Sequence, residues 1–417
     1  MSSKQRAFII NWFSCYKILQ LAFLMGSLIT ESFDVSTPTL ASDSGSRSLI
    51  HVTVLRLINW DAVYFYKLFN NEPNFEHEFV FSPFWTTLVR QLPVEDPILK
   101  FIVAGIVTNI LHLANALLIY EISKEIRIRA DFKTSSSSKF ELVSALIYVV
   151  LPAGAFVIMP YSEVFNSFLC FTGLLLKLKS ASKDGELIER KLLYLVSAIF
   201  FGIAFQVRSN SVLYGILYLI DLVQRRQRIA LFAGASMGLL VAINQFVPYY
   251  QFCRIHDFSY WADIRSSGDD FDIDLYDLGR PEWCHSKLPF LTLHAQATYW
   301  NNGFLRYWTL NNIPNFLIGL PTVLVLLASV SHKYQHQGKL VTDLKLITIV
   351  FVFLNVTCWH VQIINRVSNF IPINCWMLAE MILDDSPQRK VALGVIVYYI
   401  AWNLTQTSLY SSFLPPA

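Results

Sequence analysis

The chain has 417 residues, of which 54% are hydrophobic and only 15% are charged. A soluble domain contains about a quarter charged residues, so the composition argues against a soluble protein. The net charge of +3 gives no support for nucleic-acid binding, and the six cysteines show neither a disulfide framework nor a zinc-site spacing. What remains is a membrane protein with several spans.

Long apolar segments alternate with short polar ones, and several reach the roughly 20 residues that a helix needs to cross a bilayer. We predict a single all-α, polytopic membrane domain over residues 1–417 with about eleven spans. The predicted spans are 8–30, 98–120, 141–160, 161–178, 191–207, 210–224, 229–250, 313–331, 345–361, 367–383 and 391–410. The first span is either a signal anchor or a cleaved signal peptide, and its long apolar run favours the anchor.

Lysine and arginine concentrate at the N-terminus and in the short loops that follow every second span. The positive-inside rule makes that side cytosolic. Lys17 is an exception to the pattern, because it lies inside the first span. The opposite, lumenal side then holds two long loops, about 31–97 and 251–312. Within them we expect the Ser/Thr-rich tract 34–48 to be flexible, and we interpret the cytosolic tract 134–138 as a linker.

The first lumenal loop contains a group of acidic residues next to aromatic ones. Apolar residues at helical spacing follow Asn59, which predicts a short helix with Asn59 as its cap and Asp61 in its first turn. A second short helix is predicted from Ser82-Pro83, and the ionisable run Glu76-His77-Glu78 lies between the two. From the residues alone, Asp61 could be an ordinary helix start and 76–78 a solvated loop. A metal site there is disfavoured, because sequence neighbours rarely converge on one ion without a distant third ligand.

The second lumenal loop combines an acidic part with an aromatic part. The two Asp-x-Asp patterns in 269–274 favour a solvated acidic loop, since nothing in the chain indicates a nucleotide sugar or a soluble catalytic domain. The segment 299–308 is either an aromatic belt at the membrane surface or a platform for a sugar and a lipid head group. In the second interpretation, Trp300 and Trp308 stack on sugar rings and Arg306 binds a phosphate with two parallel hydrogen bonds.

Cys253 and Cys284 both fall on the lumenal side in this topology. An oxidising compartment permits a disulfide between them.

Polar residues also gather at three lumenal turns between spans. The turns contain Glu163, then Arg208 with Asn210, then Gln362 with Arg366. Each alone is compatible with ordinary turn chemistry or with long side chains reaching the membrane surface. Ionisable groups at membrane depth are costly, however, and three such turns on the side of both long loops indicate a lumenal cavity lined by Asp61, Glu163 and cations.

Taken in order, these motifs resemble the PIG-V family, GPI mannosyltransferase II, with details of fungal type. The resemblance covers most of the chain. It rests on the motifs Trp60-Asp61, 75–79, 81–83, 160–163, 208–210, 248–253, 283–284, 299–308, 313–316, Gln362, Arg366 and Pro372. One departure is Ser211, where many relatives have glycine, and a small residue is kept there.

The resemblance implies a GT-C glycosyltransferase in the endoplasmic reticulum membrane, with a lumenal active site. We expect no cofactor and assign no metal-ligating residues. It implies dolichyl phosphate mannose as the donor and the first mannose of a GPI precursor as the acceptor, joined by an α1,6 bond, and a small membrane-bound partner subunit. On this basis Asp61 is the expected catalytic base, with Glu163 as its main competitor. The expected substrate-binding residues are Trp60, Glu76, His77, Glu78, Arg208, Asn210, Trp300, Arg306, Trp308, Gln362 and Arg366. Of these, Arg306 or Arg366 is expected to contact the donor phosphate.

The bond types favour a single in-line displacement, because a β-linked donor and an α-linked product require inversion. Phosphate is a good leaving group, so one carboxylate base and cations near the phosphate would suffice. Two alternatives are a transporter or flippase for a lipid-linked solute and another dolichol-dependent mannosyltransferase. A transporter would need charged or broken segments near the middle of the membrane in repeated halves, and the sequence has no internal repeat.

Overall fold

The computed structural model describes residues 1–29, 33–34, 49–129, 137–181, 186–253, 281–335, 338–384 and 387–414. The described residues form α-helices and short 3-10 helices, with no β-strand among them. The predicted tracts 34–48, 134–138 and 269–274 lie mostly or wholly outside these ranges, so the expectations for them are not addressed.

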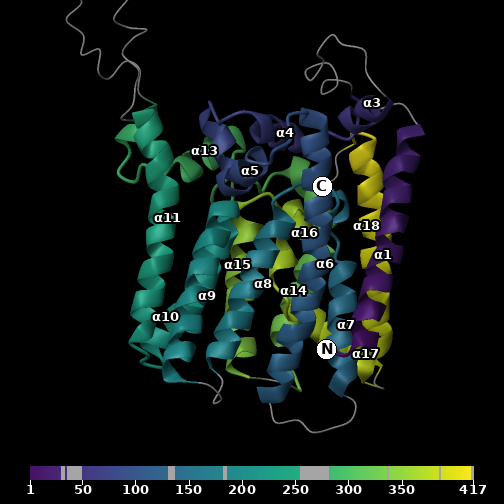
Figure 1. Cartoon of the computed structure of the whole chain (residues 1–417), viewed down its shortest axis with the longest axis vertical. Coiled ribbons are helices and arrows are strands. Elements are labelled where there is room, and N and C mark those ends of the chain that lie inside the picture. The colour runs from purple at the N-terminus through teal and green to yellow at the C-terminus, as the bar shows by residue number, and fades with distance from the viewer. Residues whose placement is uncertain are drawn as a thin grey trace, which may run out of the picture.

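Each predicted span overlaps a helix in the described part of the chain, and Figure 1 shows these helices side by side along a common direction. They are α1 (Ser3–Gly26), α6 (Pro97–Arg129), α7 (Ser137–Val149), α8 (Glu163–Ser180), α9 (Leu187–Val207), α10 (Gly215–Val223), α11 (Ile229–Cys253), α14 (Ile313–Ser331), α15 (Lys339–Cys358), α17 (Ile373–Leu383) and α18 (Gln388–Ser411). By length and apolar composition, the five described segments that contain α1, α6, α11, α14 and α15 can cross a membrane. The prediction of an all-helical, multi-span membrane protein is therefore confirmed.

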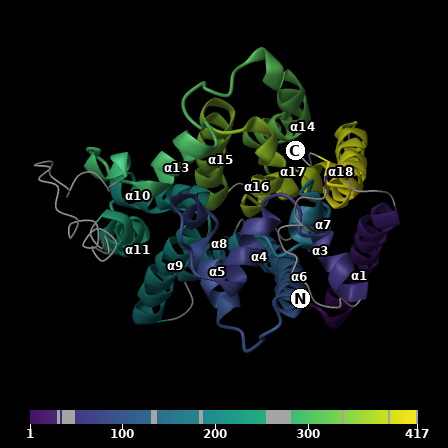
Figure 2. The ribbon, with the colours of Figure 1, turned by 90° about the horizontal axis from the view of Figure 1, so that it is seen from above.

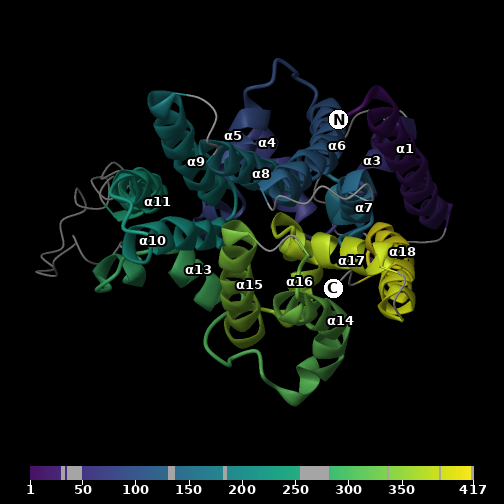
Figure 3. The same ribbon diagram turned by 90° about the horizontal axis from the view of Figure 1, so that it is seen from below.

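The short helices gather at one end of this bundle. Figure 1 places α3 (Leu49–Leu55), α4 (Ala62–Asn70), α5 (Pro83–Arg90) and α13 (Leu291–Tyr299) at the upper end, opposite the N-terminus. The two long predicted loops thus meet at the end away from the basic connections. Seen from above and from below, α1 and α18 form one flank and α11 the other (Figures 2 and 3). Buried apolar side chains from α1 to α18 form one continuous core between them.

The connection between α7 and α8 differs from the prediction. The predicted spans 141–160 and 161–178 met at Pro160, but α7 ends at Val149 and α8 begins only at Glu163. Pro152 and Pro160 cannot continue a helix, and Gly154 has φ +54°, a left-handed conformation that favours glycine. The segment between the helices, which we call the unwound segment (150–162), contains only the short 3-10 helix η3 (Gly154–Val157).

Side chains from other helices satisfy the backbone of the unwound segment, as a buried backbone requires. Lys17 Nζ donates to the carbonyl oxygen of Val157 at 2.8 Å, which explains a lysine inside the first span. The other contacts are Asn109 Nδ2 to Ile158 O, Asn403 Nδ2 to Leu151 O, and Ala155 N to Gln406 Oε1. The unwound segment is therefore a fixed part of the fold, and it ends at Glu163.

Candidate active site

Asp61 and Arg366 form an ion pair at the end of the bundle where the short helices gather. Asp61 immediately precedes α4, and Arg366 lies on α16 (Ile364–Val367). The Oδ2 atom of Asp61 accepts hydrogen bonds from Nη1 and Nη2 of Arg366, both at 3.0 Å. The Asp61 side chain is 30% exposed, and its Oδ1 atom accepts no hydrogen bond from any described residue. One carboxylate oxygen is thus held while the other is open.

Glu163 and Arg208 form a second ion pair beside the first. Arg208 Nη1 donates to Glu163 Oε1 at 2.8 Å, and Arg366 Nε lies 3.6 Å from the same oxygen. The Glu163 side chain is only 2% exposed. Asp61, Glu163, Arg208 and Arg366, which we call the charge cluster, therefore contain two carboxylates and two guanidinium groups and carry no net charge. One charged residue from each of the three predicted turns, Glu163, Arg208 and Arg366, is thus brought together with Asp61.

The unwound segment packs directly against the charge cluster and the backbone around Asp61. The hydroxyl group of Tyr161 accepts a hydrogen bond from Ala62 N at 3.1 Å and donates to Asn59 O at 3.3 Å, which fixes the backbone on both sides of Asp61. The ring of Phe156 lies 4.5 Å from Cζ of Arg366, a cation–π distance.

The start of α4 differs from the prediction. Asn59 does not cap the helix, because its side chain donates to Tyr410 O at 2.9 Å. Trp60 has φ 55°, so the chain turns sharply there, and α4 begins only at Ala62, with Asp61 in the cap position. Trp60 packs on Phe413 at a ring distance of 5.3 Å, beside the charge cluster. The predicted helix start at Pro83 is confirmed, although the Ser82 side chain makes no capping bond.

The three ionisable residues of 76–78 have three different surroundings. Glu78 is buried and forms an ion pair with Lys67. Burial alone would raise the pKa of Glu78, but the bond from Lys67 and the backbone N–H groups of Asn74 and Phe75 lower it below its ordinary value. These contacts give Glu78 a part in folding the first loop.

His77 packs against the rings of Tyr64, Phe75 and Tyr299.

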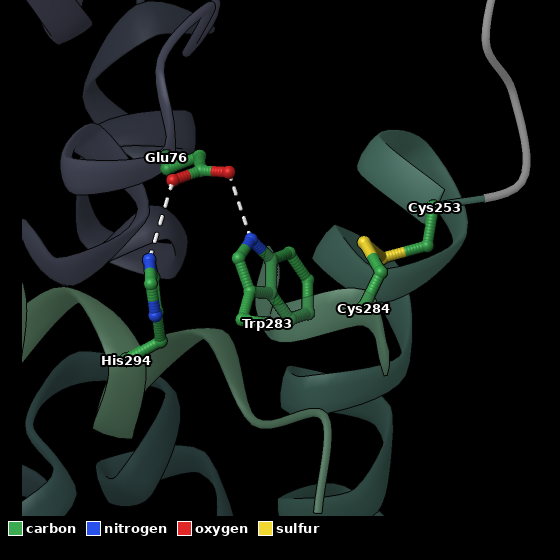
Figure 4. The surroundings of a disulfide bond; sticks show 5 residues. All are labelled: Glu76, Cys253, Trp283, Cys284 and His294. Atoms are coloured by element: carbon green, nitrogen blue, oxygen red, sulfur yellow. Dashed lines mark hydrogen bonds and ion pairs between the residues drawn. A yellow bond between two sulfur atoms is a disulfide. The ribbon is translucent and has the colours of Figure 1, made fainter. Parts of the chain in front are cut away.

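Glu76 joins the first long loop to the second. Its carboxylate accepts hydrogen bonds from Trp283 Nε1 at 2.8 Å and from the Tyr299 hydroxyl at 3.4 Å, and His294 Nε2 lies 3.9 Å away. Figure 4 shows Glu76 bonded to both Trp283 and His294, with the Cys253–Cys284 disulfide on the far side of Trp283. The disulfide that the sequence permitted is therefore present, and it ties the end of α11 to η5 (Glu282–His285).

The aromatic segment 299–308 docks on the end of α15. Gly303 N donates to Cys358 O at 2.9 Å, and Trp308 Nε1 donates to Val356 O at 2.8 Å. The Trp300 carbonyl oxygen bonds the ring of His360, and its indole packs against Phe81. This leaves Trp308 and Arg306 largely exposed.

Arg306 forms no ion pair with any described residue and lies outside the charge cluster. Of the two arginines expected at the donor phosphate, only Arg366 belongs to the cluster.

A cavity of about 960 Å³ opens beside the charge cluster, between α9, α11, α13 and the end of α15. Arg208 and Asn210 line it, so Arg208 touches both the cavity and Glu163. Most of the lining is apolar, with side chains such as Val212, Val241 and Phe246. Gln362 lies on η7 (Val361–Ile363) next to α16 and outside this lining.

Sequence inspection missed the polar residues on the α11 side of the cavity. Asn244 and Gln245 are consecutive amides within an apolar span, and Gln245 lines the cavity. Polar groups at membrane depth point to function, so this pair was a usable signal. No cluster of three or more metal-ligating side chains occurs among the described residues.

The apolar helices and the charge cluster define a multi-span membrane protein with an ionic site at one end of its helices. Its sequence matches the family model described as Mannosyltransferase (PIG-V) over residues 7–350 and 340–417. The chain belongs to this family of mannosyltransferases, which confirms the resemblance.

Curated relatives match nearly the whole chain. A GPI mannosyltransferase 2 of Candida albicans is 32% identical, over 98% of this chain and 99% of the relative. The protein of the same name from Kluyveromyces lactis is 28% identical over 100% of both, and that from Saccharomyces cerevisiae is 28% identical over 87% of both. Among solved structures, an Archaeoglobus fulgidus oligosaccharyltransferase covers 97% of this chain and 55% of its own, with 11% identity and a TM-score of 0.49. That structural likeness is too weak to assign an architecture.

Proposed function

We propose that this mannosyltransferase adds the second mannose of a GPI precursor, through an α1,6 bond to the first mannose. The observation that supports this most is the match over almost the full length to relatives named GPI mannosyltransferase 2. The proposed donor is dolichyl phosphate mannose, and the proposed architecture is a single GT-C-like membrane domain. The apolar cavity beside Arg208 has the chemistry that a lipid-linked donor needs, with an apolar wall for the lipid and a cation for the phosphate.

The reaction is an inverting displacement at C1 of the donor mannose. The acceptor hydroxyl oxygen forms a bond to C1, while the bond between C1 and the phosphate oxygen breaks. The electron pair of that bond leaves with dolichyl phosphate, and the hydroxyl proton moves to a carboxylate. Asp61 is the proposed base, because its side chain is 30% exposed and its Oδ1 atom is open. Glu163 also has one carboxylate oxygen, Oε2, without a hydrogen-bond partner among the described residues, but its side chain is only 2% exposed, so an acceptor hydroxyl cannot reach it as easily.

Arg208 is the proposed phosphate contact, because it is the member of the charge cluster that also lines the cavity. Glu163 then acts as a positioning residue that orients Arg208 and Arg366. This assignment changes the expectation from the sequence, which favoured Arg306 or Arg366. A guanidinium group offers two parallel N–H donors to a phosphate, and this geometry is lost with lysine.

The test of function is lipid analysis of cells depleted of this protein. We expect a GPI precursor with one mannose to accumulate, and we expect a plasmid with the wild-type chain to remove it. Accumulation of any other intermediate would assign the enzyme to a different step. A transporter is disfavoured because the charge cluster lies at one end of the helices and not at their middle.

The site is proposed to face the lumen of the endoplasmic reticulum, with a small membrane-bound partner subunit associated with the chain. Glycosylation tags inserted near residues 45 and 270 should be modified, and a tag near residue 135 should not. A modified tag at 135 would contradict this topology. Co-purification from detergent with a small membrane protein would test the partner.

A further inference from the structure

The cavity beside Arg208 contains buried amide groups whose hydrogen bonding is incomplete. Gln245 and Asn210 are each only 8% exposed and line the cavity, as does Asn302. Within the described residues, Gln245 Oε1, Asn302 Oδ1 and Asn210 Nδ2 have no hydrogen-bond partner. A buried polar atom without a partner costs free energy, so these three atoms indicate a ligand that completes them.

The orientation of the Gln245 amide follows from a hydrogen-bond chain that begins at a backbone carbonyl. Gln206 Nε2 donates to Leu240 O, so Gln206 Oε1 is the acceptor for Asn244 Nδ2, at 2.8 Å. Asn244 Oδ1 in turn accepts from Gln245 Nε2 at 2.7 Å, and Gln245 Nε2 also donates to Thr292 Oγ1 at 3.1 Å. Because a backbone carbonyl can only accept, each amide in the chain is fixed, and Gln245 is left with a free oxygen.

Asn302 also has an oxygen without a partner, although its amide is oriented by the side chain of Gln296 and not by a backbone carbonyl. Its Nδ2 atom donates to Gln296 Oε1, and its backbone N–H donates to Gln296 O at 2.9 Å. Gln296 and Asn302 both line the cavity. Two separate elements, α11 and the loop after α13, therefore each present one unpaired oxygen.

The two unpaired oxygens limit which ligand groups can bind them. An amide oxygen accepts hydrogen bonds but donates none, so it cannot bind an ionised phosphodiester, which also only accepts. Hydroxyl groups are the matching donors. A phosphate instead accepts hydrogen bonds, and the N–H groups of Arg208 and Asn210 in the same cavity can donate them.

We infer that Gln245 and Asn302 accept hydrogen bonds from sugar hydroxyl groups of the donor, and so recognise its sugar separately from its phosphate. This inference rests on the proposed function, and it names sugar-recognition residues on α11 and in the 301–303 loop. Arg208 holds the phosphate and the apolar lining holds the lipid. A site that hydrogen-bonds a hydroxyl discriminates against ligands that lack it, because its own buried oxygen is then left unpaired.

The test compares two ligands that share lipid and phosphate but differ in the sugar. The full chain, in microsomes, is assayed for the KM of dolichyl phosphate mannose and for the inhibition constant of dolichyl phosphate. Gln245→Met keeps the length of the side chain but removes the acceptor, together with the Nε2 donor to Asn244 and Thr292. Asn302→Ala shortens the side chain and removes the acceptor, together with the Nδ2 donor to Gln296. We expect each variant to raise the KM about 3- to 10-fold, as for one lost neutral hydrogen bond, with the inhibition constant of dolichyl phosphate within about 2-fold of wild type.

The matched control is Gln91→Met, the same substitution at an exposed residue outside the cavity, which should change neither constant. A parallel rise of both constants would overturn the inference, because the residues would then shape the phosphate or lipid site, or the fold. Unchanged constants in both variants would also overturn it. Failure of the proposed function is distinct, since the wild-type chain would then transfer no mannose from this donor.

Discussion

Replacing Asp61 by asparagine is the most direct test of the proposed chemistry. Asparagine keeps the size of the side chain and an oxygen for Arg366, but it cannot accept the proton of the attacking hydroxyl. Base catalysis contributes roughly 100- to 10,000-fold, equivalent to about 2.7–5.5 kcal/mol of barrier. We therefore expect Asp61→Asn to lower the rate of mannose transfer by at least about 100-fold.

The effect on folding should be much smaller. The Asp61–Arg366 bond becomes one between a charged and a neutral group, and this change costs about 1 kcal/mol. Arg366 Nε also remains 3.6 Å from Glu163 Oε1, so the positive charge of Arg366 is still balanced by a carboxylate. The expected loss of activity therefore exceeds the expected loss of stability by about 2–4 kcal/mol, and the protein should remain in the membrane at its normal level.

The assay is mannose transfer from dolichyl phosphate mannose in microsomes, with protein level measured by immunoblot. Asp96→Asn is a matched control, because Asp96 is an exposed carboxylate of the same long loop, 44% accessible and paired with His51. If Asp61→Asn keeps more than about a tenth of the wild-type activity, Asp61 is not the base. Glu163→Gln is then the next variant, although the burial of Glu163 argues against that role.

Two further substitutions test the phosphate contact and the unwound segment. Arg208→Lys should lower donor turnover about 10-fold or more, as for a lost hydrogen bond to a charged group, whereas Arg306→Lys should have little effect. Equal activity of the two variants would remove Arg208 from the phosphate site. Gly154→Ala should lower the amount of folded protein, because φ is +54° and an added Cβ would clash with the side-chain oxygen of Gln406, whereas the added Cβ in Gly394→Ala meets open space. Protein level and thermal unfolding in detergent measure the difference, and a normal level of Gly154→Ala would contradict the account of this segment.

Much of the fold could be predicted from the sequence because the bilayer imposes length and hydrophobicity on every span. The predicted boundary that was wrong lies between α7 and α8. Hydropathy cannot distinguish a membrane helix from an apolar segment whose backbone is bonded by distant side chains. Lys17 and Asn403, which supply two of those bonds, lie more than 130 residues away along the chain.

The candidate site could be predicted in part for a related reason. The predicted membrane topology placed four residues at one face of the membrane: Asp61, Glu163, Arg208 and Arg366. Their charge at membrane depth made them candidates for a functional site. Sequence could not pair them, because the pairing depends on how the unwound segment and α16 approach α4. Sequence also could not separate Glu78, an internal partner of Lys67, from Glu76, which bonds the second loop.

The neutral charge of the cluster fits the charge balance of the proposed reaction. The donor is a phosphodiester with one negative charge, and the released dolichyl phosphate gains a second as the bond to C1 breaks. In the same step the acceptor proton moves to Asp61 and neutralises it, which weakens the attraction of that carboxylate for Arg366. The cluster therefore becomes more positive by one charge while the phosphate becomes more negative by one. The total charge of the site stays constant, so a partly buried site avoids the desolvation cost of an uncompensated charge.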